Sequence, residues 1–424
     1  MESSQWWPRE ALLRHQLEQL GQLIRHAFTT VPLHQTRLAA AGYRVGQSIT
    51  PEFWRTLPLL TRREMQEQRD ALLSARPPES HGRQLQDATS GSTGMPVRIV
   101  KTDFVQILWH AMTLREELWQ RRDWSLKLGV IRRDANGESG YPGRRHPDWG
   151  APMGMVYTTG PAELLDTRTS VEEQAEWLMR VQPNYLLSFP SIIDELARHC
   201  LAAGLRPRAL RGIKTFGEVV DPDLRDLCRR AWDVEIADMY SAVEVGYIAL
   251  QCPEYAHYHV QSEVMMVEVL DEHGRDCRPG EVGQVVLTSL HNYAMPIIRY
   301  APGDYAEAGE PCPCGRGLPV LKRILGRSRN MVTLPSGVRR FPLLGINKTL
   351  ATIDALVQFQ LAQKTLEEIE VRLVARRPLT PEEETKLRDL LIANLGHAFQ
   401  LVFTYHAQIP RSAGGKFFDF VSEL

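Results

Sequence analysis

The chain has 424 residues, of which 43% are hydrophobic and 24% charged, as in ordinary soluble globular proteins. Its formal net charge of −1 gives no general attraction to nucleic acid or to an anionic membrane, so an anionic partner must be held by local groups. The first residues lack a basic start followed by an apolar stretch, and no run reaches the roughly 18 uninterrupted apolar residues that span a bilayer. We therefore expect a cytoplasmic protein that binds neither nucleic acid nor membrane.

The first part of the chain predicts helices and strands in alternation. Apolar residues at helical spacing predict one helix over residues 9–28 and a second over 103–124, whose Trp109, Met112 and Trp119 we expect in the core. Between residues 183 and 240, short apolar runs alternate with helical patterns, which favours a parallel sheet with helices on its faces. The sequence thus predicts an α/β fold.

The pattern changes from Val264 onward. Strands separated by turns are expected over residues 264–290, with 271–276 as a hairpin connection. Later, residues 367–375 indicate a strand, and a helix is expected to begin after Thr380, where a proline and an acidic first turn follow.

We expect two domains. The larger one, residues 1–327, would contain helix-flanked sheets and a small β-rich subdomain near residues 250–320. The smaller one, residues 328–424, would be a mobile α+β lid domain.

Residues 89–96, TSGSTGMP, form a segment rich in glycine and hydroxyl groups. It is not a Walker A loop, because Met95 follows Gly94 where that loop needs a lysine. Glycines allow close approach of the backbone to an anion, and hydroxyl groups can donate to phosphate oxygens. A linker has the same composition, so the segment alone leaves both interpretations open.

Further motifs follow this segment in a fixed order: DMYSAVEVG (238–246), GEVGQVVLTSL (280–290), MPIIRYAPGD (295–304), ILGRSRNM (324–331) and IPRSAGGKF (409–417). Together with TSGSTGMP they resemble the motifs of the adenylate-forming superfamily of acyl-CoA synthetases, adenylation domains and luciferases. LPLLT (57–61), PNYLLSFPS (183–191) and CPCGRGLP (312–319) resemble its phenylacetate–CoA ligase branch, which includes coenzyme F390 synthetase-like proteins. The resemblance covers most of the chain from about residue 50.

This resemblance implies a reaction with ATP and Mg²⁺. A carboxylic acid, which we expect to be aromatic or heteroaromatic, would be activated as an acyl-adenylate with release of pyrophosphate, and the acyl group would pass to the thiol of coenzyme A. Two alternatives stay open: transfer to a carrier-protein thiol or an amine, and a nucleotide-binding homologue whose thioester chemistry has lapsed. A homodimer is an alternative to a monomer.

The same resemblance implies roles for individual residues. Lys416 would bridge the carboxylate and the α-phosphate, and Glu244 would hold Mg²⁺. Tyr240 would stack on adenine, and Asp304 would accept both ribose hydroxyls, since one carboxylate can accept two hydrogen bonds. The nucleotide-binding set is Thr89, Ser90, Gly91, Ser92, Thr93, Gly94, Gly217, Glu218, Asp238, Met239, Tyr240, Asp304 and Arg327. Phe189, Ser191 and Phe216 would line the acyl pocket.

The chain departs from the superfamily pattern at two places. Val243 stands where a hydroxyl residue normally sits beside the α-phosphate, which could slow adenylation. Arg329 and Asn330 stand where two acidic residues are usual in the hinge about which the C-terminal domain rotates. The second half-reaction is therefore less firmly implied than the first.

Four of the six cysteines lie in one region, Cys252, Cys277, Cys312 and Cys314, which suggests a metal site before a disulfide. Thiolates and imidazoles are good Zn²⁺ ligands. The phenylacetate branch carries a similar arrangement, and it implies a structural zinc site of Cys252, His259, Cys312 and Cys314, with His259 preferred over His257. Free thiols in a turn-rich region are the alternative.

Overall fold

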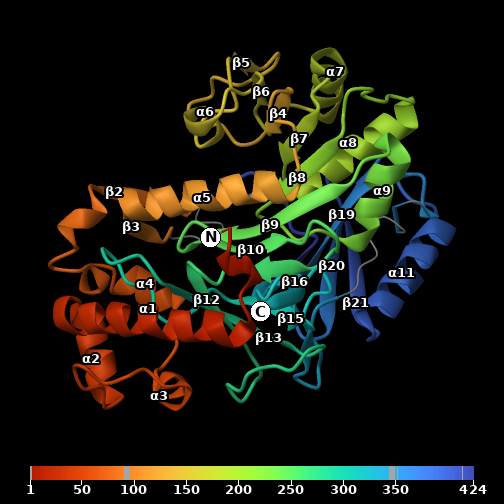
Figure 1. The fold of residues 1–424 in the computed structure, drawn as a ribbon. Helices are drawn as coiled ribbons and strands as arrows, with labels where there is room; N and C mark the ends of the chain where they lie inside the picture. Colours follow the sequence, from red (N-terminus) through yellow and green to blue (C-terminus); the bar gives the residue numbers. More distant parts are fainter. Residues whose placement is uncertain (1, 90–95, 343–348, 351, 413) are drawn as a thin grey trace.

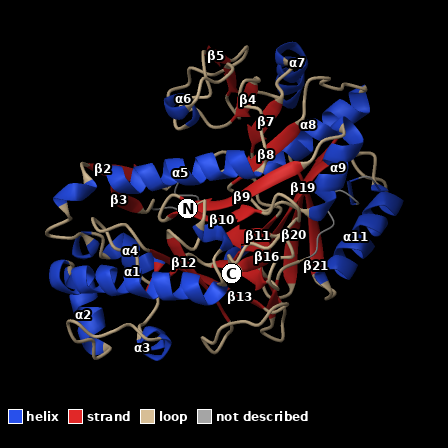
Figure 2. Ribbon diagram, viewed as in Figure 1, coloured by secondary structure: helices blue, strands red, loops and turns tan. Residues whose placement is uncertain are grey.

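The computed structural model describes residues 2–89, 96–342, 349–350, 352–412 and 414–424. Within these ranges, fourteen strands form one mixed sheet, and a separate four-stranded sheet is built from the C-terminal part of the chain. Helices flank both sheets (Figure 1, Figure 2). The predicted α/β fold with a smaller α+β region is confirmed.

One half of the large sheet is parallel. The parallel strands, with the antiparallel edge strand β5, are β4 (Leu128–Ile131), β5 (Arg144–His146), β6 (Ala162–Leu165), β7 (Tyr185–Ser188), β8 (Gly212–Phe216) and β9 (Ile236–Ala242). Most residues of strands β4, β7, β8 and β9 are buried, which accounts for the nearly continuous apolar runs in their sequences.

The helices on one face of this half begin at residues suited to a helix start. Ser170 and Glu173 form a capping box at α7 (Val171–Val181), and prolines open α8 (Pro190–Ala203) and α9 (Pro222–Trp232). These helices and the neighbouring strands share one apolar core. A short helix, α6 (Met153–Val156), lies between β5 and β6 in the chain.

The other face is covered by α5 (Asp103–Trp119). Successive side chains of a strand point to opposite faces, so on β8 Ile213 packs in the core with α8, whereas Lys214 contacts Glu117 of α5. In Figure 1, α5 crosses the strands β9 and β10. The hairpin of β2 (Gln84–Ala88) and β3 (Arg98–Thr102) precedes it.

α5 is shorter than the helix predicted over residues 103–124. It ends at Trp119, and Arg121 has a φ of 50°, which a right-handed helix does not allow. Met112 and Trp119 are buried as expected, whereas Trp109 lines the cavity described below.

The second half of the large sheet is mainly antiparallel, as the change of pattern at Val264 predicts. The predicted hairpin is present, because β12 pairs with β13 across the turn at residues 271–276. β11 pairs with β10 on one side and β16 on the other, so the two halves form one continuous sheet. The strands are β1 (Leu60–Thr61), β10 (Gly246–Gln251), β11 (Tyr258–Val260), β12 (Met265–Leu270), β13 (Val282–Ser289), β14 (Tyr300–Ala301), β15 (Asp304–Ala308) and β16 (Val320–Arg327).

The N-terminal helices pack against this second half. Leu20 and Ile24 of α1 lie in one core with Leu290 and Ile298, so the helix predicted over residues 9–28 is confirmed. The N-terminal elements are η1 (Ser4–Trp6), α1 (Arg9–Thr30), α2 (Pro32–Ala40), α3 (Pro51–Thr56), α4 (Arg62–Glu67), η2 (Asp70–Leu72) and η3 (Glu79–His81).

The C-terminal part has its own sheet and its own apolar core. Thr380 forms a capping box with Glu383 at the start of α11, and the predicted strand near residues 367–375 is β20. The elements are η4 (Ser328–Asn330), β17 (Val332–Thr333), β18 (Arg339–Arg340), β19 (Leu356–Gln363), β20 (Glu368–Ala375), α11 (Pro381–Leu395), β21 (Gln400–Tyr405) and β22 (Phe420–Ser422).

Two expectations about the whole chain stay predictions. One is the division into domains of residues 1–327 and 328–424, and the other is the cytoplasmic location. Among the described helices, none is long and apolar enough to cross a membrane.

Candidate active site

A cavity of about 2130 Å³ lies where the carboxyl ends of the parallel strands meet the C-terminal segment. Phe189 follows β7, Gly217 follows β8, and Ser241 lies near the end of β9. Ligands of open α/β sheets bind at this edge of the strands. Residues 408–409, 411, 414 and 416–420 of the C-terminal segment also line the cavity, including Lys416.

Three predicted nucleotide-binding residues contact each other where strands β9, β15 and β16 line the cavity. The Tyr240 hydroxyl on β9 donates to Asp304 Oδ2 on β15 at 2.6 Å, and Arg327 Nε on β16 donates to Asp304 Oδ1 at 3.2 Å. Burial, with Asp304 nearby, raises the pKa of Tyr240 well above its usual value. Each oxygen of Asp304 keeps a further lone pair for a ligand.

Arg62 links Glu244, the predicted magnesium ligand, with Thr89 of the predicted phosphate-binding segment. Its Nη1 donates to Glu244 Oε1 at 3.0 Å, and its Nη2 lies 3.4 Å from the Thr89 hydroxyl. Glu244 is buried, so an unpaired charge there would be costly. Arg62 was not among the predicted site residues, because the motif LPLLT ends one residue earlier, at Thr61. A cation directly after this helix cap could have indicated an anion-binding residue. Ser90, Gly91, Ser92, Thr93 and Gly94 lie outside the described residues.

Lys416 reaches the cavity beside Gly217. Its Nζ lies 3.2 Å from the position that a Cβ on residue 217 would take, and Gly217 has a φ of +77°, so this position requires glycine. Burial lowers the pKa of Lys416, against the opposing effect of Glu218. The Glu218 carboxylate accepts from the Phe417 N–H at 2.8 Å and from the Ser191 N–H at 2.9 Å. Glu218 therefore holds the loop of Lys416 against the start of α8.

The remaining predicted site residues also line the cavity. Phe189 and Phe216 pack with ring centroids 4.7 Å apart, and the Ser191 hydroxyl accepts from Arg411 Nη1 at 2.6 Å. Asp238, beside Met239 on β9, accepts from the hydroxyls of Thr215 and Tyr258 at 2.6 and 2.7 Å. Burial raises the pKa of Asp238 to about 6.

The residues that depart from the superfamily pattern lie at the same place. Val243 is 43% exposed and lines the cavity. The Arg329 guanidinium carbon lies 4.3 Å from the Phe418 ring centroid, and Asn330 Nδ2 donates to the Phe420 carbonyl at 2.8 Å. Burial and the neighbouring arginines lower the pKa of Arg329 to about 10. Both predicted hinge residues thus contact the C-terminal segment.

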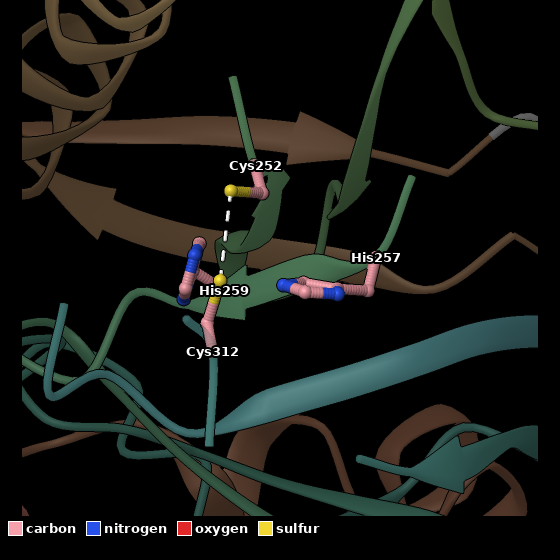
Figure 3. Close-up of side chains that lie close together, drawn as sticks. All are labelled: Cys252, His257, His259 and Cys312. Atoms are coloured by element: carbon pink, nitrogen blue, oxygen red, sulfur yellow. Dashed lines mark hydrogen bonds between the residues drawn. The ribbon is translucent and has the colours of Figure 1, made fainter. Parts of the chain in front are cut away.

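A second group of side chains could hold a metal ion. Ligand atoms of Cys252, His257, His259 and Cys312 all lie within 4.8 Å of one another. In Figure 3 the sulfur atoms of Cys252 and Cys312, 3.8 Å apart, face each other between the two imidazole rings. The Cys314 sulfur lies 3.4 Å from His259 Nε2. The structure therefore brings three of the four predicted ligands together with His257, which the sequence interpretation had set aside, and places the fourth, Cys314, against His259.

Comparisons with known proteins agree with this geometry. Residues 342–423 match the family model described as the CapK C-terminal domain. Over 457 residues, covering 96% of each chain, the protein is 24% identical to a phenylacetate-coenzyme A ligase of Thermus thermophilus. It is 25% identical over 350 residues to a phenylacetate-coenzyme A ligase of Pseudomonas putida, covering 78% of this chain and 74% of the relative. The chain is thus similar to phenylacetate-coenzyme A ligases along nearly its whole length. The similarity to these two ligases confirms the resemblance to the phenylacetate–CoA ligase branch that the motifs indicated.

Solved structures also resemble this chain over most of its length. A 2-hydroxyisobutyryl-CoA ligase in its postadenylation state matches 96% of this chain and 89% of its own, with a TM-score of 0.76 and 18% identity. The same ligase in its thioesterification state matches with a TM-score of 0.62, 19% identity and the same coverage. The described arrangement is therefore closer to the postadenylation form.

Proposed function

We propose that the chain is an AMP-forming acid–thiol ligase that activates a carboxylic acid with ATP and transfers the acyl group to coenzyme A. One observation carries this proposal: Glu244, Asp304 and Lys416 converge with Tyr240 in one cavity at the carboxyl ends of the parallel strands. The relatives support it by name, since they are phenylacetate-coenzyme A ligases.

In the first step, an oxygen of the substrate carboxylate attacks the α-phosphorus of ATP, and the bond to the oxygen bridging the α- and β-phosphates breaks. Both reactants are anions, so the protein must neutralise charge and align them. Lys416 would lie between the carboxylate and the α-phosphate, and Arg327 would contact ribose or phosphate. Asp304 would accept the ribose hydroxyls, and Tyr240 would stack on adenine.

A magnesium ion fits the carboxylate chemistry of Glu244 and would supply further neutralisation of the phosphates. Arg62 already pairs with Glu244 at this end. We propose that Arg62 and Thr89, together with the segment of residues 90–94, bind the β- and γ-phosphates until pyrophosphate leaves. A solved structure of O-succinylbenzoate coenzyme A synthetase from Bacillus subtilis, in complex with ATP and magnesium ion, supports such a site.

In the second step, the thiol sulfur of coenzyme A attacks the acyl carbon of the adenylate, and AMP leaves. The contacts of Lys416, Glu218 and Phe417 hold the C-terminal segment over the cavity, so we propose that residues 328–424 form a lid that rotates between the two steps. The two states of 2-hydroxyisobutyryl-CoA ligase support this, because the chain matches one far better than the other.

The test is acid-dependent exchange between ATP and pyrophosphate across a panel of aryl, heteroaryl and fatty acids. We expect exchange with an aryl or heteroaryl acid, and thioester formation when coenzyme A is added. Exchange without any coenzyme A thioester would favour a carrier-protein or amine acceptor, which holo-carrier protein or an amine then tests. Nucleotide binding without exchange for any acid would overturn the ligase proposal and indicate lapsed chemistry.

We also propose a structural zinc ion bound by Cys252, His259 and Cys312, with Cys314 or His257 as the fourth ligand. The chemistry of these side chains suits tetrahedral Zn²⁺. Native mass spectrometry of the purified chain should show one zinc ion, and the paired change of Cys252 and Cys312 to serine should abolish it. A zinc-free, folded wild-type chain would contradict the proposal. A homodimer and a carrier-protein partner stay predictions of the resemblance.

A further inference from the structure

The cavity also extends along the face of the sheet that α5 covers, where polar side chains form part of its wall. Thr113 and Glu117 of α5 line it, as do Lys214 of β8 and Tyr247 of β10. The hydroxyls of Thr113 and Tyr247 lie 3.1 Å apart. An unsubstituted aromatic ring carries no hydrogen-bonding group that these side chains could contact.

Lys214 belongs to a buried cluster of four charges. Its Nζ lies 2.5 Å from Glu116 Oε2 and 2.7 Å from Glu117 Oε1, and Arg122 pairs with the same two carboxylates at 2.7 and 2.9 Å. All four side chains are 8% exposed or less. Burying four charges is expensive, and apolar replacements would often be as stable, so a polar wall at this position suggests a ligand.

The distance between this wall and the reaction centre suits one aromatic ring. Gly217, beside Lys416, lies three residues after Lys214, which corresponds to roughly 10 Å of extended chain. Lys214 and Phe216 point to the same face of β8, because side chains alternate along a strand. An acid with its carboxylate at Lys416 and its ring against Phe216 would therefore direct a far substituent toward Lys214.

Resting on the proposed ligase function, we propose that Thr113, Glu117, Lys214 and Tyr247 form a subsite for an uncharged hydroxyl or amino substituent on an aryl acid. The Lys214 ammonium has three N–H donors, of which two already meet carboxylates, and Glu117 can accept from the substituent. The charges of the cluster are balanced, so a substituent with a formal charge would be left unpaired.

The test compares ATP–pyrophosphate exchange with benzoate and phenylacetate against their 3- and 4-hydroxy, amino and carboxy derivatives. We expect kcat/KM for a hydroxy or amino acid to exceed that of its parent by roughly tenfold or more, and the dicarboxylates to be poorer than either. Thr113→Val and Tyr247→Phe should each reduce this ratio several-fold. Tyr185→Phe, a buried tyrosine of β7 that does not line the cavity, is the matched control and should keep the ratio.

Equal or better exchange with the unsubstituted parents would overturn the subsite while leaving the ligase function in place. An unchanged ratio in both Thr113→Val and Tyr247→Phe would also overturn it. Absence of exchange with every acid would remove the ligase function and the subsite together, so the two failures are distinguishable. Thermal unfolding of each variant, followed in parallel, separates loss of fold from loss of preference.

Discussion

Arg62 lies at the phosphate end of the cavity, where its guanidinium contacts both Glu244 and Thr89. A hydrogen bond to a charged group contributes about 1.5–3 kcal/mol. We predict that Arg62→Met lowers kcat/KM for ATP in the exchange reaction by roughly 10- to 100-fold. Arg63→Met is the matched control, because Arg63 is 83% exposed and pairs with Glu67 on the surface of α4. Equal activity of the two variants would contradict the role of Arg62.

Asp238 provides a prediction of pH dependence. Burial raises its pKa to about 6, above the roughly 3.9 of an unfolded chain, so the folded state favours the protonated carboxyl. Its contribution to stability is therefore fully present below about pH 4 and is lost as pH rises through about 6, an effect of roughly 2–3 kcal/mol.

Asp238→Asn removes this titration. Relative to the wild type, the variant should gain free energy of unfolding between pH 4 and pH 7.5, as measured by urea denaturation without ligands. Asp226→Asn changes a 70% exposed carboxylate on α9 and should show no such gain. Parallel curves for wild type and Asp238→Asn would refute the prediction.

Site residues that lie inside the ordered motifs could be predicted from the sequence, because each motif identifies the residues within it. Tyr240, Asp304 and Lys416 line one cavity, as the resemblance implied, although their catalytic roles stay predictions. Arg62 directly follows the motif LPLLT, so a local signal for it existed, whereas the importance of His257 depends on contacts between distant parts of the chain. Glu218, predicted among the nucleotide-binding residues, lines the cavity, and its carboxylate accepts from two backbone N–H groups beside Lys416.

At the scale of elements, the start of α8 is fastened to the C-terminal segment by Arg411. Its Nη1 donates to the Ser191 hydroxyl and its Nη2 to Glu195 Oε1, both at 2.6 Å, and Gln358 donates to the same Glu195 oxygen at 3.0 Å. These contacts hold Lys416 over the cavity. They must break if the lid rotates, so Arg411 should favour adenylation alone.

We predict that Arg411→Met slows acid-dependent exchange roughly tenfold or more, whereas thioester formation from a synthetic acyl-adenylate is unchanged or faster. The matched control is Arg377→Met, whose side chain is 52% exposed and pairs with Glu383 of α11. If both half-reactions fell equally in Arg411→Met, the residue would serve stability and not the position of the lid.

Elements with strong local signals were predicted correctly from the sequence, whereas the pairing of strands distant in the chain was not predicted. The Thr380 capping box marks the start of α11 through neighbours in the chain. The continuity of the large sheet depends on β11, a strand of three residues that pairs with β10 and β16. Such a short strand carries no periodic pattern, so the sequence did not indicate that the two halves form one sheet.

At the scale of the whole molecule, the Cys252 and His259 cluster lies where the two halves of the sheet join. The predicted nucleotide contacts come from both halves, since Tyr240 is on β9 and Asp304 on β15. We predict that a zinc chelator lowers the melting temperature by several degrees and weakens ATP binding, although no cluster residue lines the cavity within the described part of the chain. A non-chelating isomer of the chelator is the control, and unchanged ATP affinity after verified metal loss would refute the coupling.

The packing of α1 also has a consequence for synthesis of the chain. Gln16 donates to the Ser262 carbonyl, 246 residues later, and the apolar face of α1 is completed by Leu290 and Ile298. Val31, Leu38 and Trp54 of the same core are made soon after α1, but on a ribosome that adds about 5–20 residues per second this face would wait roughly 10–50 s for Leu290 and Ile298. During that interval it would present an apolar surface to chaperones and to other nascent chains. Burial of this face is thus completed only after residues 290–298 have been synthesised.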